Sequence, residues 1–255
     1  MKELFDLKGK TALVTGGSQG IGRGIVLALA EFGANVVINY HSRDAEALSA
    51  KAEAEEFGVR ALLWKFDLSK TGVKSAWESF AAENDCHADI LVANASLQFR
   101  REWDEITEDE FAAQMNVNVR STLELMQATV PYMKQKRWGR ILNIGSVQQA
   151  RYNRSMAIYA ASKSALVNLV KNVAARVAPF GITVNNLAPG VFATTRNREV
   201  LADAEFRKNI EAKIPLGFIA EPRDCAGTAL LLCSDAGRYI TGADFFVDGG
   251  FSLYL

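Results

Sequence analysis

Cysteine and histidine are both scarce in this chain. The cysteines are Cys86, Cys225 and Cys233, and the histidines are His41 and His87. None of them has the sequence spacing of a zinc site or of a redox pair, and two cysteines on one helix are poorly placed for a disulfide. We therefore expect reduced thiols, a cytoplasmic location and no bound metal, and we do not expect histidine to act as a general base.

The chain also lacks an excess of charge and a long apolar segment. Its 29 basic side chains match its 29 acidic ones, so neither nucleic acid nor an anionic membrane is an expected partner. No apolar run is long enough to span a bilayer, and the first residues, MKELFDLKGK, do not resemble a secretion signal. What remains is an ordinary globular composition, 49% hydrophobic over 255 residues. It predicts a single domain over residues 1–255.

Short apolar runs alternate with longer amphipathic stretches along the chain. The runs predict strands at Ala12–Thr15, Val36–Asn39, Ala61–Phe66, Ile90–Ala93, Ile141–Ile144, Thr183–Leu187 and Asp244–Val247. The stretches predict helices at Ile21–Phe32, Asp44–Phe57, Val73–Glu83, Glu108–Gln135, Ala157–Ala178 and Arg223–Ser234. Several runs have no polar alternation, as expected for strands covered on both faces. This order predicts an α/β fold, a Rossmann-type doubly wound parallel sheet of about seven strands with helices on both faces.

Two segments depart from this regular pattern. The excursion from about residue 191 to 215 is polar, charged and long for a connection, and its part Leu201–Ala212 has a helical pattern. Long connections of this kind often form lids or binding loops, so we expect it to border a substrate site. Pro131 lies inside the fourth helical stretch. Proline removes a backbone donor there, which predicts a kink or a break.

Three glycines, Gly16, Gly20 and Gly22, lie in the stretch TGGSQGIG between the first predicted strand and the first predicted helix. The N-terminus of a helix exposes unpaired N–H groups and the positive end of its dipole, which together favour a phosphate. Glycines allow a sharp turn and let the backbone approach a pyrophosphate closely. A tight turn that binds nothing would explain the glycines alone equally well.

The stretch also matches the TGxxxGIG signature of the short-chain dehydrogenase/reductase family. The residues that carry the resemblance further follow in chain order: Asp67, Asn94-Ala95, Asn118, Ser146, Tyr159-x-x-x-Lys163, Pro189-Gly190 and Val247-Asp-Gly-Gly250. The resemblance therefore covers nearly the whole chain. It implies an NAD(P)-dependent oxidoreductase that interconverts a secondary alcohol and a carbonyl by hydride transfer, assembled as a homotetramer.

The catalytic candidates are Ser146, Tyr159, Lys163 and Asn118. Tyr159 and Lys163 are four residues apart in a helical pattern, so both side chains can face one cleft. A nearby ammonium stabilises a phenolate, which suits tyrosine to proton transfer near neutral pH. By resemblance, Ser146 donates a hydrogen bond to the substrate oxygen, Tyr159 transfers the proton, and Lys163 also holds the nicotinamide ribose. The resemblance further implies that Asn118 anchors a water in the proton relay, although Asn116 competes for this role on sequence alone.

The end of the second predicted strand bears on the choice between NAD and NADP. A site selective for NAD usually has a carboxylate there for the ribose hydroxyls, whereas this chain reads Asn39-Tyr-His-Ser-Arg43. Ser42 and Arg43 could bind a 2′-phosphate instead, since a guanidinium suits that anion. Ser18 and Gln19 stand where many NADP-dependent relatives have a basic residue, which argues the other way. We favour NADP as the cofactor, with NAD possible.

By resemblance, further cofactor contacts come from the glycine loop and from the ends of later strands. They are Gly16, Ser18, Gln19, Gly20, Ile21, Gly22, Asp67, Leu68, Asn94, Ala95, Tyr159, Lys163, Pro189, Gly190, Val191, Phe192 and Thr194. The chain departs from the family at Ala93-Asn-Ala-Ser96, where Asn-Asn-Ala-Gly is usual. The first change removes a brace between central strands and the last adds a Cβ, so the local backbone geometry stays open.

Polar and cationic side chains are expected around the substrate. The candidates are Gln148, Gln149, Tyr152 and Arg196. This set suits a sugar, a polyol or another small polar carbonyl or alcohol compound. One alternative is a 3-oxoacyl-acyl-carrier-protein-type reductase, because that group shares the C-terminal motifs. An alternative of another class is a non-catalytic dinucleotide-binding or sensing protein.

Overall fold

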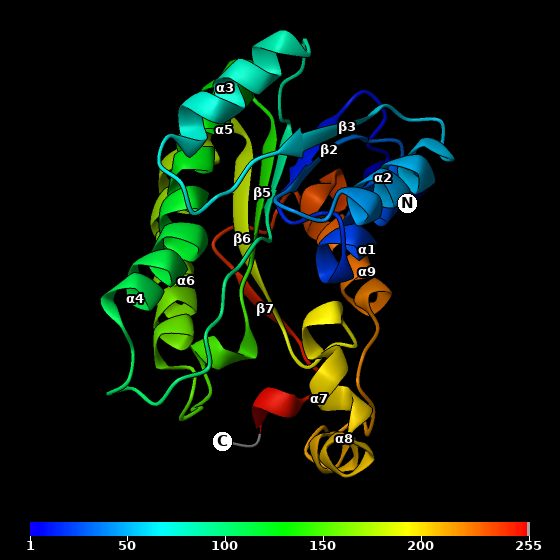
Figure 1. The fold of residues 1–255 in the computed structure, drawn as a ribbon. Coiled ribbons are helices and arrows are strands. Elements are labelled where there is room, and N and C mark those ends of the chain that lie inside the picture. Colours follow the sequence, from blue (N-terminus) through cyan, green and yellow to red (C-terminus); the bar gives the residue numbers. More distant parts are fainter. Residues whose placement is uncertain (254–255) are drawn as a thin grey trace.

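The computed structural model describes residues 1–253, so the last two residues of the predicted domain lie outside the described part. Its centre is a seven-stranded sheet in the order β3-β2-β1-β4-β5-β6-β7 (Figure 1). The strands are β1 (Thr11–Val14), β2 (Asn35–Tyr40), β3 (Ala61–Lys65), β4 (Ile90–Ala93), β5 (Gly139–Ile144), β6 (Ile182–Pro189) and β7 (Asp244–Val247). Every neighbouring pair is parallel.

Helices cover both faces of the sheet. They are α1 (Gly20–Glu31), α2 (Asp44–Glu55), α3 (Val73–Glu83), α4 (Glu108–Met115), α5 (Ser121–Lys136), α6 (Ala157–Val177), α7 (Arg198–Ala202), α8 (Ala204–Glu211) and α9 (Pro222–Cys233). In Figure 1, α1, α2 and α9 lie on one side of the sheet, and α3, α5 and α6 lie on the other. This arrangement confirms the predicted doubly wound α/β fold.

The two layers follow from the apolar strands. In β1, Ala12 and Val14 join the core beneath α1 and α9, while Leu13 joins the core beneath α3 and α5. All three side chains are fully buried. Because successive side chains of a strand point to opposite faces, an apolar residue at every position requires a cover on both sides.

The fourth predicted helix is divided into two. α4 ends at Met115, a π-helical turn spans Asn116–Arg120, and α5 follows from Ser121. Of the kink or break expected at Pro131, the break is wrong, since α5 continues through this residue, and the kink stays a prediction. Pro131 and Gln127, whose carbonyl would otherwise accept from the missing N–H, are both exposed. Water can therefore satisfy that carbonyl.

The excursion after β6 forms α7 and α8 at the carboxyl end of the sheet (Figure 1). The single helix predicted over Leu201–Ala212 is interrupted at Asp203, whose Oδ1 accepts hydrogen bonds from the N–H groups of Glu205 (2.9 Å) and Phe206 (3.1 Å). This cap begins α8. A small apolar cluster then fixes the excursion to the loops below it; its buried members are Val147, Ile214, Ile219 and Phe251.

Candidate active site

A cavity of about 620 Å³ lies at the carboxyl ends of the strands, where open α/β sheets bind ligands. Every predicted cofactor position lines it: Gly16, Ser18, Gln19, Gly20, Ile21, Gly22, Ser42, Arg43, Asp67, Leu68, Asn94, Ala95, Tyr159, Lys163, Pro189, Gly190, Val191, Phe192 and Thr194. Ser146 lines it as well. The fold thus brings residues from six strand ends and from α6 to one opening.

The glycine loop has the shape that a pyrophosphate requires. Gly16 and Gly20 have φ values of 60° and 55°, which favour glycine. A Cβ on Gly22 would lie 2.3 Å from the Gly16 carbonyl oxygen and 2.6 Å from Asn94 Nδ2. α1 begins without a side-chain cap at Gln19, so its first N–H groups face the cavity unpaired. These residues fit an anionic dinucleotide.

Asn94 and Thr15 brace the loop from the neighbouring strand. Thr15 Oγ1 accepts from the N–H groups of Asn94 and Ala95, both at 2.9 Å. Asn94 Nδ2 donates to the carbonyl oxygens of Thr15 (2.8 Å) and Gly16 (3.2 Å). The ends of β1 and β4 are therefore joined although Ala93 stands where the family has asparagine.

Ser146 directly follows β5 and begins a short turn over Val147–Gln149. Its Oγ accepts from the Gln148 N–H at 3.2 Å, so its own hydrogen remains to donate to a ligand. The Gln149 side chain supports the turn from behind: its Oε1 accepts from the Ser146 N–H (3.4 Å) and its Nε2 donates to Asp244 Oδ2 (2.7 Å). A Cβ on Gly145 would lie 2.5 Å from Gln149 Oε1, so this packing requires glycine.

Tyr159 and Lys163 project from one face of α6. They are 6% and 2% exposed, and Lys163 Nζ lies 5.7 Å from the centre of the Tyr159 ring. Nζ donates to the Ile144 carbonyl oxygen at 2.7 Å. Burial, with a smaller contribution from the positive charge of Arg196, lowers the pKa of Lys163 to about 7. The pKa of this amine therefore lies near neutral pH, so a change in its surroundings can change its protonation state.

Asn118 lies behind the cavity rather than on its lining. It stands in the π-helical turn and is 1% exposed. Its Oδ1 accepts from the Leu97 N–H (2.8 Å), and its Nδ2 donates to the Leu97 carbonyl oxygen (3.0 Å) and to Ser162 Oγ (2.9 Å). Ser162 Oγ donates in turn to the Tyr159 carbonyl oxygen. Asn118 therefore ties the loop after β4 to the part of α6 that carries Tyr159.

The four predicted substrate-pocket residues divide into two pairs. Gln148 and Arg196 line the cavity, whereas Gln149 and Tyr152 do not. Gln149 points toward β7, as described above, because the turn sends successive side chains in different directions. Tyr152 is 88% exposed and faces solvent. For these two residues the predicted place on the lining is wrong.

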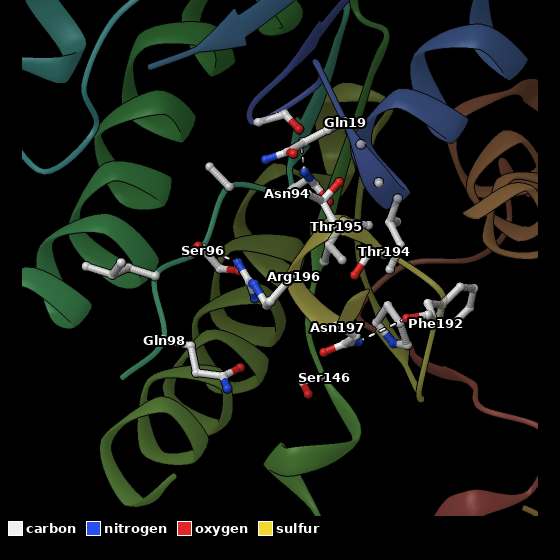
Figure 2. A pocket seen from close by; sticks show the side chains of 18 of the residues that line it. Gln19, Asn94, Ser96, Gln98, Ser146, Phe192, Thr194, Thr195, Arg196 and Asn197 are labelled. Atoms are coloured by element: carbon white, nitrogen blue, oxygen red, sulfur yellow. Dashed lines mark hydrogen bonds between the residues drawn. The ribbon is translucent and has the colours of Figure 1, made fainter. Parts of the chain in front are cut away.

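Arg196 crosses from the excursion to the opposite wall. Its Nη2 donates to the carbonyl oxygen of Ser96 (2.7 Å) and to Ser96 Oγ (3.0 Å). Figure 2 shows Arg196 between Ser96 and the turn that carries Thr195 and Asn197, with Ser146 at the same opening. The serine that replaces the family glycine at position 96 thus supplies one of the two acceptors.

The far end of the cavity, after β2 and β3, holds Ser42, Arg43 and Asp67. The first carboxylate after β2, Asp44, does not line it. Asp44 is bound to Lys65 Nζ (2.8 Å) and to the Tyr40 hydroxyl (2.9 Å), and the hydrogen bond from Lys65 lowers its pKa. Arg43 lies 3.4 Å from Glu46 on the surface. This end of the cavity therefore presents the Arg43 cation, and the segment after β2 supplies no carboxylate there that could accept from ribose hydroxyls.

Burial raises the pKa of Asp67, but hydrogen bonds from Ser69 and the nearby His41 outweigh it, so the pKa lies below its usual range. Asp67 is therefore a carboxylate at neutral pH. Within residues 1–253, no three His, Cys, Asp or Glu side chains gather in a way that could hold a metal ion. No helix in the same range is long and apolar enough to cross a membrane.

Comparison with known proteins decides the family. The family model described as Enoyl-(Acyl carrier protein) reductase matches residues 16–252. The chain is 36% identical to L-rhamnose 1-dehydrogenase (NADP(+)) of Thermoplasma acidophilum, over 99% of this chain and 100% of that protein. The chain belongs to the short-chain dehydrogenase/reductase family. It is accordingly an NAD(P)-dependent oxidoreductase that interconverts an alcohol and a carbonyl.

Two solved structures of this family resemble the chain closely. The first is a gluconate 5-dehydrogenase from Burkholderia cenocepacia in complex with NADP and tartrate, with a TM-score of 0.92, 34% identity, and coverage of 100% of this chain and 99% of that one. The second is a 3-oxoacyl (acyl-carrier-protein) reductase from Agrobacterium tumefaciens with NADP bound. It has a TM-score of 0.92, 34% identity and coverage of 98% and 96%.

The motifs of the short-chain dehydrogenase/reductase family did not indicate every residue that shapes this site. Asn39 lines the cavity; its Oδ1 accepts from the Gly16 N–H (3.4 Å) and its Nδ2 donates to the carbonyl oxygens of Trp64 and Phe66 (3.2 Å each). The one available signal was an amide at the end of an otherwise apolar strand. Asn197, which donates to the Phe192 carbonyl oxygen (2.9 Å) and steadies the excursion, gave no signal.

Proposed function

We propose that the protein is an NADP(H)-dependent alcohol dehydrogenase or carbonyl reductase that acts on small, hydroxyl-rich compounds. The observation that supports it most is the placement of Ser146, Tyr159 and Lys163 on the wall of the cavity that also contains the glycine loop. The dinucleotide, when bound, supplies or accepts a hydride at its nicotinamide ring. The protein's own residues orient the substrate and move the proton.

Each of the three side chains has a distinct role in this proposal. Ser146 donates its free hydroxyl hydrogen to the substrate oxygen, which polarises a carbonyl. Tyr159 gives its phenolic proton to that oxygen during reduction and takes it back during oxidation. Lys163 stabilises the phenolate when its amine is protonated, and it would also hold the nicotinamide ribose of a bound dinucleotide. Asn118 acts through Ser162 by fixing the backbone of Tyr159.

The preference for NADP rests on the far end of the cavity. Asp44 is already bound to Lys65 and Tyr40, so it is not free to accept from ribose hydroxyls. Arg43 and Ser42 line the cavity instead, and a guanidinium with a hydroxyl suits a 2′-phosphate. The relative from Thermoplasma, named for NADP(+), supports the same choice.

A panel assay tests the activity. NADPH and NADH oxidation is followed with sugar-derived ketones and aldehydes, and NADP⁺ and NAD⁺ reduction with the matching alcohols. We expect turnover with a hydroxyl-rich substrate and a higher kcat/KM with the NADP pair. Tight cofactor binding without turnover on any member would instead favour the non-catalytic binding protein.

A 3-oxoacyl-acyl-carrier-protein reductase is the second candidate, since one of the similar structures is a 3-oxoacyl (acyl-carrier-protein) reductase. Docking of an acidic carrier protein needs free cations at the rim of the cleft. Arg101 is paired with Glu110 (2.9 Å) and Arg154 with Glu102 (3.0 Å). These two arginines are therefore not free for such docking, whereas Arg100 and Arg196 on the lining take part in no ion pair among the described residues. Faster turnover of an acetoacetyl thioester than of every polar carbonyl would reverse this preference.

We further propose a homotetramer in the cytoplasm. Exposed apolar side chains lie on α4 (Phe111, 46%), on β7 (Phe246, 38%) and in the helical turn Phe251–Leu253 (Leu253, 77%), where burial against other copies would remove them from water. The buried free thiols of Cys86, Cys225 and Cys233 suit a reducing compartment. Light scattering on the purified protein measures the assembly, and a monomer at micromolar concentration would contradict it.

A further inference from the structure

The charges around the cavity are distributed unevenly. Among the described residues, the only carboxylate on its lining is Asp67, which follows β3. Ser146 follows β5, four strands away in the sheet, which corresponds to about 19 Å. The lining near Ser146 and Tyr159 includes Lys163, Arg100 and Arg196 and no acidic side chain. The end where the substrate reacts is therefore positive and has no built-in counterion.

Of the two arginines in this set, Arg196 is the one that hydrogen bonds hold in place. Both of its hydrogen bonds to Ser96 come from Nη2. A guanidinium has five N–H donors, so Nε and Nη1 keep their hydrogens for a ligand. Within residues 1–253 they form no hydrogen bond or ion pair. Figure 2 shows the group above the opening that Ser146 borders.

A neutral ligand would not compensate the positive charges at this position. Arg196 and Lys163 carry like charges on one lining; burial is the main cause of the lowered pKa of Lys163, and the positive charge of Arg196 adds to it. A carboxylate beside Arg196 would offset this repulsion and form charge-assisted hydrogen bonds, which are about twice as strong as neutral ones. A hydroxyl group would also accept from the guanidinium, but as a neutral acceptor it would leave the positive charges of Arg196 and Lys163 without a counterion.

We propose that Arg196 binds a carboxylate of the substrate, so that the enzyme acts on polyhydroxy acids or their oxo forms rather than on neutral sugars. This inference rests on the proposed function and narrows its substrate class. Ser96 is the positioning residue: its two acceptors hold Nη2 of the guanidinium and leave the N–H groups of Nε and Nη1 for the acid. The reaction itself is unchanged, with one hydride and one proton exchanged at a secondary alcohol elsewhere on the acid.

The test uses pairs of ligands that differ in one group, an aldonic acid and the polyol with CH₂OH in place of its carboxylate. Calorimetric titration into the NADP⁺-saturated protein gives the Kd of each member, and initial rates give kcat and KM. We expect each acid that fits to bind more tightly than its polyol. Arg196→Gln should weaken acid binding by roughly 10- to 100-fold, the value of hydrogen bonds to a charged group, and change polyol binding by less than about threefold. Arg196→Lys should restore part of the loss.

Arg198→Gln is the matched control. Arg198 lies two residues away in the same excursion, is exposed and does not line the main cavity. It should leave both ligands unaffected.

Several results would overturn the inference. One is that no acid binds more tightly than its polyol; another is that Arg196→Gln weakens both members of a pair equally. A third is that the variant weakens NADP⁺ itself rather than the acid, which would assign the cation to the cofactor's phosphates. Turnover of polyols alone would keep the proposed function while removing this narrower class. Absence of any turnover would instead count against the proposed function, and the calorimetry would still decide the carboxylate question.

Discussion

Replacement of Lys163 by methionine in the cofactor-free protein would measure how much burial of one charged amine lowers the free energy of unfolding. The side chain is 2% exposed, and burial lowers its pKa from 10.5 to about 7. At roughly 1.4 kcal/mol per pKa unit, holding the charged amine in the fold costs on the order of 4 to 5 kcal/mol. Methionine has a similar length and no charge, but it leaves the Ile144 carbonyl without its donor, a loss of about 1 kcal/mol. We therefore expect Lys163→Met to be inactive and yet more stable than the native protein at neutral pH.

The dependence on pH separates this effect from simple repacking. Because the folded-state pKa is the lower one, the unfolded chain binds the proton more tightly between about pH 7 and 10.5. The free energy of unfolding of the native protein therefore rises with pH in this window, by at most about 1.4 kcal/mol per pH unit from this group. Below pH 7 the cost of the buried charge is complete and constant.

Urea unfolding of both proteins across this window is the assay. Groups remote from Lys163 titrate alike in the two proteins, so the stability advantage of Lys163→Met should shrink from about pH 7 to pH 10. An advantage that stays constant over this range, or a variant that is less stable at pH 7, would refute burial of the charged amine as the cause.

Two further substitutions test the remaining parts of the site. Arg43→Gln should raise the Kd for NADP⁺ by about fivefold or more, because it removes a charge-assisted contact at a partly exposed site, and it should leave the Kd for NAD⁺ unchanged. Lys51→Gln on α2, outside the cavity lining, is the control. Equal effects of Arg43→Gln on both cofactors would contradict the assignment of the 2′-phosphate to Arg43. Gln149→Leu should lower kcat roughly tenfold with little change in KM, because it removes the hydrogen bonds that hold the turn after β5 and so orient Ser146. A change in KM alone would indicate instead that Gln149 contacts the substrate.

The sheet and the cofactor end of the site could be predicted from the sequence. Strands such as β1 can be recognised because every position is apolar. A strand covered on both faces buries consecutive residues on opposite sides, as it does Ala12, Leu13 and Val14. Gly16, Gly20 and Gly22 are fixed by close backbone contacts that allow no Cβ or by positive φ values. Such constraints are local, so they leave a trace in the sequence.

The directions of single side chains could not be predicted. Gln148 and Gln149 are identical neighbours in the sequence, yet the first lines the cavity and the second binds Asp244 on β7. That choice depends on a contact 95 residues away. The same holds for the bond between Arg196 and Ser96, 100 residues apart, and for Pro131, whose tolerance depends on the exposure of α5.

The central claim is that the phenol of Tyr159, which lines one cavity together with Lys163 and Ser146, carries the proton of an NADP-linked redox reaction. Its most direct test is the turnover number of Tyr159→Phe on the best substrate of the panel, with NADPH binding measured in parallel. Removal of a general acid predicts a loss of about 10²- to 10⁴-fold in kcat with the affinity for NADPH nearly unchanged. A variant that binds NADPH and turns over at a near-normal rate would contradict the account.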